Sequence, residues 1–208
     1  DSQALKQLTA VLHYYAGDPQ AEADFSKMNQ EQPDDFFAAN FLALSLSDAK
    51  APDGKPDDVK RAKAIRIAEM NARLNPRSPV ALATLGWTYF NAGRINEATQ
   101  LFAALEQQQN LQVAPDTAYY MARTFAALPS QQYPNALGRA KSLLELSVQA
   151  GGVFRYRKQA EEWLTALGGV VPPQSGASSR PATVAVPETP KAEEPKQPAS
   201  GTKEDDKK

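Results

Sequence analysis

Few residues in this chain have the type and spacing that catalysis needs. His13 is the only histidine, so no second imidazole exists to form a site with it. Carboxylates occur as neighbours in sequence: Asp34 and Asp35, Glu161 and Glu162, and Asp205 and Asp206. Adjacent side chains diverge on a helix, whereas general acid and base catalysis needs groups that converge in a pocket. We therefore expect no catalytic residue, and we interpret His13 as a packed or half-exposed structural side chain.

Motifs for cofactors and metals are also missing from the sequence. No GxGxxG, GxxxxGKS/T or GxSxG pattern occurs. The chain has no cysteine, which excludes thiolate metal ligation and disulfide bonds. Basic clusters around Lys60 and Arg155 are interleaved with acidic residues, and this pattern predicts solvated helix faces rather than a phosphate track. We expect no cofactor, no metal, no nucleic acid partner and no enzymatic activity.

Length and charge limit the kind of partner further. The 208 residues are 42% hydrophobic and carry a formal net charge of −1. Such a chain can bury one sizeable core and has no global field that attracts nucleic acid or anionic membrane. No run approaches the ~20 apolar residues that span a bilayer, so we expect no membrane insertion. We expect the terminal part or a processed form of a larger bacterial protein, with cytoplasm and cell envelope both open.

The residue pattern up to about position 169 predicts helices throughout. Ala, Leu, Glu, Gln, Lys and Arg dominate, and the alternation typical of strands is missing. Ser78, followed by proline, has the character of an N-cap. We expect Asp34 or Asp35 to cap the helix from Phe36, and Asp116 to cap a helix that begins near Thr117. The fold class that follows is all-α.

The segment Leu82–Phe102 has the spacing of two helices joined by a tight turn at Gly93. The first apolar stripe consists of Leu82, Leu85, Gly86 and Tyr89. The second consists of Ile95, Ala98, Leu101, Phe102 and Leu105. Small residues in these stripes let paired helices approach closely. Because one helix pair cannot bury both of its faces, we expect it to stack on similar pairs.

These residues resemble the tetratricopeptide repeat family, whose consensus is matched closely by Leu85, Gly86, Tyr89, Gly93, Ala98 and Phe102. Other helix pairs match in outline: Phe36–Ser47 with Val59–Leu74, Thr117–Leu128 with Asn135–Ala150, and a degenerate pair, Ala4–Ala16 with Pro19–Gln30. The segment Phe154–Leu167 is similar to the single helix that caps such arrays. The resemblance implies a tetratricopeptide-like α-solenoid of three to four helix pairs plus a capping helix within residues 1–169. An ordinary helical bundle is the alternative.

A second stripe on the first helix of each pair would line the concave groove of such an array. The residues that we expect to bind a protein or peptide partner there are Asn40, Trp87, Phe90, Asn91, Tyr119 and Arg123. Trp, Tyr and Arg are enriched at binding hot spots. In the alternative interpretation, Trp87 and Phe90 pack against the neighbouring repeat and serve only the core. Ala83 and Trp87 occupy the places at which some family members hold a carboxylate with Lys and Asn, which argues against that clamp.

Residues 170–208 differ in composition from the rest of the chain. From Val171 onward there are seven of the 16 prolines and no aromatic residue. Such a segment buries too little apolar surface to offset its ordering entropy, so we expect a disordered tail that acts as a linker. Two PxxP spacings, Pro187–Pro190 and Pro195–Pro198, leave a polyproline ligand as the lesser alternative.

The sequence therefore predicts a non-catalytic interaction scaffold that binds a peptide or protein segment in the concave groove of its repeats. Two other classes stay open. The chain could be an accessory domain of a larger enzyme, or a structural module that associates with itself. The partner, the compartment and the oligomeric state are not predicted.

Overall fold

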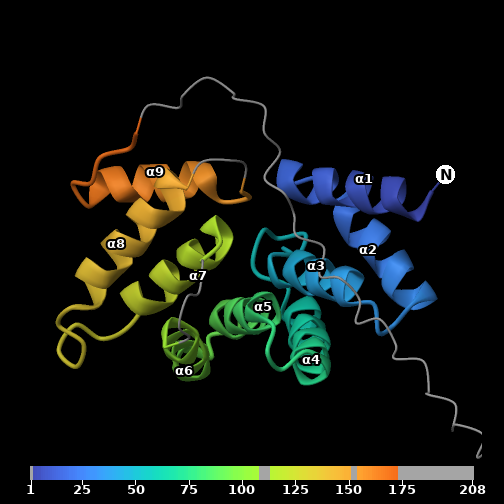
Figure 1. Ribbon diagram of the computed structural model, residues 1–208, viewed down its shortest axis with the longest axis horizontal. Helices are drawn as coiled ribbons and strands as arrows, with labels where there is room; N and C mark the ends of the chain where they lie inside the picture. Colours follow the sequence, from blue (N-terminus) through green and yellow to red (C-terminus); the bar gives the residue numbers. More distant parts are fainter. Residues whose placement is uncertain (1, 108–112, 151–153, 173–208) are drawn as a thin grey trace, which may run out of the picture. The chain divides into compact units, whose positions relative to one another are not determined.

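The computed structural model describes residues 2–107, 113–150 and 154–172, and over these ranges the chain is helical, without strands (Figure 1). The helices belong to one compact unit, Asp1–Ala177. They are α1 (Gln3–Ala16), α2 (Gln20–Glu31), α3 (Phe36–Ser47), α4 (Asp58–Leu74), α5 (Pro79–Asn91), α6 (Ile95–Glu106), α7 (Pro115–Ala126), α8 (Ala136–Gln149) and α9 (Arg157–Ala166). The predicted all-α class is confirmed for these residues. The predicted tail lies outside them from residue 173 onward.

Local capping explains why several helices begin where the sequence predicts. The side chain of Asp35 accepts a hydrogen bond from the backbone N–H of Ala38 at 2.7 Å, and α3 begins at the next residue. Ser78 caps α5 in the same way, through the N–H of Ala81 at 3.3 Å. Each side chain satisfies one of the N–H groups that the first helical turn leaves without a carbonyl. Both predicted N-caps are confirmed, with Asp35 rather than Asp34 at α3.

Two helix starts differ from the prediction. Asp116 does not cap α7, because that helix begins at Pro115 with Ala114 as its N-cap residue. The carboxylate of Asp116 instead accepts a hydrogen bond from the backbone N–H of Arg155 at 3.3 Å. The last helix, α9, starts at Arg157 rather than at Phe154. The segment Phe154–Tyr156 stays outside the helix, and its residues contact α1, α3, α5 and α7 instead.

Helix packing follows the order of the chain. Each helix from α1 to α9 packs against the next, and the odd-numbered helices also contact one another, α1 with α3, α3 with α5, and α5 with α7. Gly86 in α5 lies directly against the ring of Phe102 in α6, where an added Cβ would stand 2.6 Å from the ring carbon Cζ. The prediction that Gly86 is a position of close helix approach is therefore confirmed. After α5, Gly93 adopts a positive φ of 76°, which permits the tight turn into α6.

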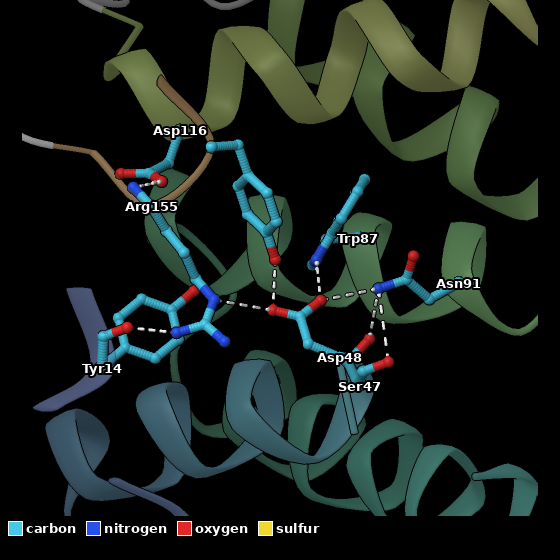
Figure 2. A network of polar contacts seen from close by, with 8 residues as sticks. Tyr14, Ser47, Asp48, Trp87, Asn91, Asp116 and Arg155 are labelled. Atoms are coloured by element: carbon cyan, nitrogen blue, oxygen red, sulfur yellow. Dashed lines mark hydrogen bonds and ion pairs between the residues drawn. The ribbon is translucent and has the colours of Figure 1, made fainter. Parts of the chain in front are cut away.

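The same packing brings several helix ends together. The carboxyl ends of α3 and α5 lie beside each other, since Asn91 donates a hydrogen bond to the hydroxyl of Ser47 at 2.8 Å. Tyr14, near the end of α1, and Asp116, in the first turn of α7, both contact Arg155 (Figure 2). Segments that are far apart in sequence therefore converge on one small polar region.

Candidate functional site

The centre of this region is the carboxylate of Asp48, the residue directly after α3. It accepts hydrogen bonds from the indole Nε1 of Trp87 and from the Nδ2 of Asn91, each at 3.2 Å (Figure 2). The hydroxyl of Tyr156 also donates to it. The side chain of Asp48 is largely withdrawn from solvent, since only 14% of it is exposed. Four donors from two segments, α5 and Phe154–Tyr156, hold the carboxylate in place.

Arg155 supplies the positive charge for this carboxylate. Its Nε lies 3.2 Å from Oδ2 of Asp48. The guanidinium also donates to the backbone carbonyl of Tyr14 and lies over the Tyr14 ring, with 4.5 Å between Cζ and the ring centroid. The prediction of a solvated helix face is wrong for this residue, which precedes α9 and is 21% exposed. Arg155 joins α1, α3 and α7 through charge, carbonyl and ring contacts.

Aromatic rings cover one side of the polar cluster. The ring of Tyr156 stacks on Tyr119 with centroids 4.9 Å apart and an interplanar angle of 8°. Trp87 stacks on Tyr120 with centroids 4.5 Å apart and meets Tyr156 edge-on at 5.5 Å. Such ring pairs stabilise by ~0.5–1.5 kcal/mol each beyond the area that they bury. We call Tyr14, Asp48, Trp87, Asp116, Tyr119 and Tyr120 together the acidic–aromatic surface, and Arg155 and Tyr156 lie on it.

Burial changes the acid–base properties of the two carboxyl groups. Loss of solvation raises the pKa of Asp116 to about 7, opposed by its hydrogen bond with Arg155. Burial also raises the pKa of Asp48, although Tyr156 and Arg155 favour its charged form. The pKa values of Tyr14 and Tyr156 rise well above their usual range because burial disfavours the phenolate. Near neutral pH, Asp116 therefore holds less negative charge than a solvated carboxylate would.

The residues that we predicted to bind a partner lie in different environments. Trp87 and Tyr119 are 4% and 2% exposed, beneath Tyr156, whereas Phe90 and Asn91 are half-buried and Arg123 is exposed. The guanidinium of Arg123 lies 5.9 Å from the ring centroid of Phe90. Ring and cation–π contacts link Trp87, Phe90, Tyr119 and Arg123. Asn91 is connected to them only through Asp48, to which both Asn91 and Trp87 donate. Whether they bind a partner stays a prediction.

Asn40 does not join this group. It is buried, and among the described residues its side-chain oxygen Oδ1 has no hydrogen-bond partner. No hydrogen bond or ring contact within the described ranges connects it to Trp87 or Tyr119. Asn40 was expected to line the partner-binding groove together with the other five residues, but its side-chain oxygen makes no hydrogen bond with the cluster.

Sequence reasoning missed Asp48, Asp116, Arg155 and Tyr156. The available signal was the alternation of Phe154, Arg155 and Tyr156 just before a helix, because two large rings on either side of an arginine are unusual for a solvated segment.

His13 pairs with Asp24, with 2.6 Å between Nδ1 and Oδ2, at a half-exposed position. This agrees with its structural interpretation.

The described residues contain no group of three or more His, Cys, Asp or Glu side chains that could hold a metal ion. None of the described helices is long and apolar enough to cross a membrane. Comparison with protein-family models, with curated proteins and with solved structures found no match to this chain. The site must therefore be interpreted from its own geometry.

Proposed function

We propose that this protein is a non-catalytic interaction scaffold, a tetratricopeptide-like array that binds a peptide segment in the groove between its odd-numbered helices. The alternation of contacts supports an array, since each helix packs on the next and α1, α3, α5 and α7 also contact one another in order. The close approach of Gly86 to Phe102 is what the repeat consensus requires at those positions. The absence of a matching family model leaves this assignment to the residues and their packing.

The observation that carries the proposal is the way in which the chain's own segment Phe154–Tyr156 lies on the acidic–aromatic surface. It is not helical, and it makes the contacts that a bound peptide would make. Its arginine pairs with Asp48, and its backbone N–H donates to Asp116. Its tyrosine ring stacks on Tyr119. The surface therefore has complementarity for a segment in which an arginine precedes an aromatic residue, and we infer that a partner segment of this chemistry replaces Phe154–Tyr156.

A half-exposed patch next to this surface extends the proposed contact area. Arg123 lies between the rings of Phe90 and Trp163, 5.9 Å and 5.6 Å from their centroids. Arg and Trp are the residue types most enriched at binding hot spots, and a cation held over rings is already oriented for a partner. The patch comes from α5, α7 and α9, so a bound segment that continued past Tyr119 would meet it.

The proposal is tested by emptying the surface and refilling it with a free peptide. In the variant Arg155→Ala, Tyr156→Ala, a synthetic peptide of residues 153–158 should bind, as measured by calorimetry. The unaltered protein should bind the peptide at least ~10-fold more weakly, because its own segment competes at high effective concentration. A peptide with alanine in place of its arginine serves as the control ligand.

The acceptor side of the interaction has its own control. Adding Asp48→Asn to the variant Arg155→Ala, Tyr156→Ala should weaken binding of the peptide by ~10-fold or more. The substitution removes the charge partner of the peptide's arginine. Glu162→Gln, an exposed carboxylate on α9, should leave the affinity unchanged. A folded variant that fails to bind the peptide at millimolar concentration would contradict the proposal.

A further inference from the structure

A depression of about 470 Å³ lies beside the polar cluster, at the ends of several helices. It is lined by residues of the end of α1, the segment after α3, the starts of α4 and α9, and the end of α5. Its polar and charged residues include Asp48, Lys50, Arg61, Arg155, Tyr156 and Gln159. The proposed peptide contacts involve only Asp48, Arg155 and Tyr156 of this lining. The other lining residues have no role in the proposed peptide binding.

The charges around this depression do not balance. Its one carboxylate, Asp48, is compensated by the ion pair with Arg155 and by hydrogen bonds from neutral donors. Within the described ranges, Lys50 and Arg61 form no ion pair. A neighbouring depression of about 260 Å³ shares Lys50 and Arg155 with it, but its further cation, Lys60, is paired with Glu22 at 2.7 Å. Two positive charges thus face the larger depression without a negative partner.

Arg61 carries a second sign of a missing ligand. Its Nε is buried, and no acceptor among the described residues meets it. A buried N–H without a partner is destabilising, and such groups in native proteins call for an acceptor such as a water molecule or an ion. The planar guanidinium presents its N–H groups as a fork that matches the oxygens of an oxyanion. The unused donor therefore lies on the residue type best suited to bind one.

We propose that this depression binds a phosphate group, with Arg61 and Lys50 as its charge partners and the amide of Gln159 as a neutral donor. The two uncompensated cations match a dianion better than a single carboxylate, which would leave one positive charge unbalanced. The volume exceeds that of one phosphate, so both free inorganic phosphate and a small phosphate monoester fit. The proposed phosphate contacts differ from the proposed peptide contacts, since neither Arg61 nor Lys50 forms a hydrogen bond or ion pair with Phe154–Tyr156 in the described chain, although Arg155 and Tyr156 also line the depression.

The test is titration of the full chain with sodium phosphate at constant ionic strength. Binding is measured by calorimetry, and stabilisation is measured as a change in the melting temperature. Phosphate should bind and raise the melting temperature, and acetate at the same ionic strength should not. Arg61→Gln and Lys50→Gln should each weaken phosphate binding by ~10-fold or more. Phosphoserine as a second probe separates the two sources: tighter binding than phosphate assigns the site to a monoester, and weaker binding assigns it to the free ion.

The matched control is Lys63→Gln, which removes an exposed cation from the same helix, outside the depression. It should leave phosphate affinity unchanged. Arg61→Lys keeps the charge but not the fork, and should lose part of the affinity while it stays folded. Equal responses to phosphate and acetate, or equal phosphate affinities in Arg61→Gln and Lys63→Gln, would overturn the proposal.

Discussion

The Nε of Arg155 lies 3.2 Å from Oδ2 of Asp48, so that a residue just before the last described helix neutralises the carboxylate at the end of α3. Both side chains are largely withdrawn from solvent. Removing one member of a buried ion pair leaves the other charge without compensation, and this cost is larger than the net stabilisation of the intact pair. The pair therefore stabilises the contact between the segment Phe154–Tyr156 and the acidic–aromatic surface.

Arg155→Ala should lower the free energy of unfolding by about 3–5 kcal/mol, because Asp48 loses its only ion-pair partner in the described chain. Urea unfolding followed by circular dichroism measures this change. Lys158→Ala is the control, since its side chain is 87% exposed and pairs with Glu162 at the surface, and it should change stability by less than ~0.5 kcal/mol. Equal effects of the two variants would contradict the buried pair.

The pairing itself is measured by a double-mutant cycle. Asp48→Asn combined with Arg155→Met should be less destabilising than the sum of the single changes, by at least ~1 kcal/mol, because the double variant buries no unpaired charge at these positions. Additive effects would show that Arg155 acts only through Tyr14 and Asp116.

Gly86→Ala should destabilise by ~1–3 kcal/mol, because the new Cβ would stand 2.6 Å from Cζ of Phe102 and force the two helices apart. Gly138 gives the matched control within α8, since nothing lies within 4 Å of the position of its Cβ. There the same change should stabilise by up to ~1 kcal/mol through helix propensity. Melting temperatures of the two variants should move in opposite directions.

The helices could be predicted from the sequence because their signals are local. Apolar periodicity and the side chains of Asp35 and Ser78 act within one or two turns, and α3 has both of its predicted ends. The predicted start of α9 was wrong for the opposite reason, because the signal that sets it is not local. Phe154–Tyr156 has ordinary helix composition, and only contacts with α1, α3 and α7, distant in sequence, keep it outside the helix.

The candidate site was predicted in part. Ring-bearing residues on one face of α5 and α7 were expected to come together, and Trp87 and Tyr119 do so, with centroids 6.1 Å apart. Their burial was not expected in the leading interpretation, because what covers them is Tyr156 from another part of the chain. Asp48 and Arg155 resemble solvated charges by residue type, and only tertiary structure removes them from water.

The raised pKa of Asp116 predicts a pH dependence of stability. An acid whose pKa rises on folding, here from 3.8 to about 7 through burial, binds more protons in the folded state. Its contribution to stability is complete below pH ~4 and declines as the pH rises toward 7. Asp48, whose pKa is also raised by burial, acts in the same direction, whereas Arg155 favours the charged form of both. Unfolding free energies measured between pH 4 and 8 should therefore fall with rising pH.

Asp116→Asn isolates this effect. The amide oxygen can still accept the hydrogen bond from the backbone N–H of Arg155, but the side chain no longer titrates. The fall in stability between pH 4 and 7 should become shallower, with the remaining slope due to Asp48. Asp53→Asn is the control at an exposed carboxylate and should leave the slope unchanged. An unchanged slope in Asp116→Asn would mean that its carboxyl group titrates normally in the folded protein.

Trp87 and Arg123 should separate the structural from the binding role of the predicted groove. Trp87→Ala should cost ~3–5 kcal/mol of folding, because the ring is buried between Tyr120 and Tyr156 and its Nε1 donates to Asp48. Arg123→Ala should cost less than ~1 kcal/mol, since its guanidinium is exposed. Arg123→Ala should also weaken the binding of a natural partner that contacts Phe90 and Trp163. The affinity of that partner is measured for the unaltered protein and for the variant. Arg123→Ala could keep full affinity for the natural partner while the variant Arg155→Ala, Tyr156→Ala still binds the free peptide. That result would show that the bound segment ends before it reaches Phe90, Arg123 and Trp163.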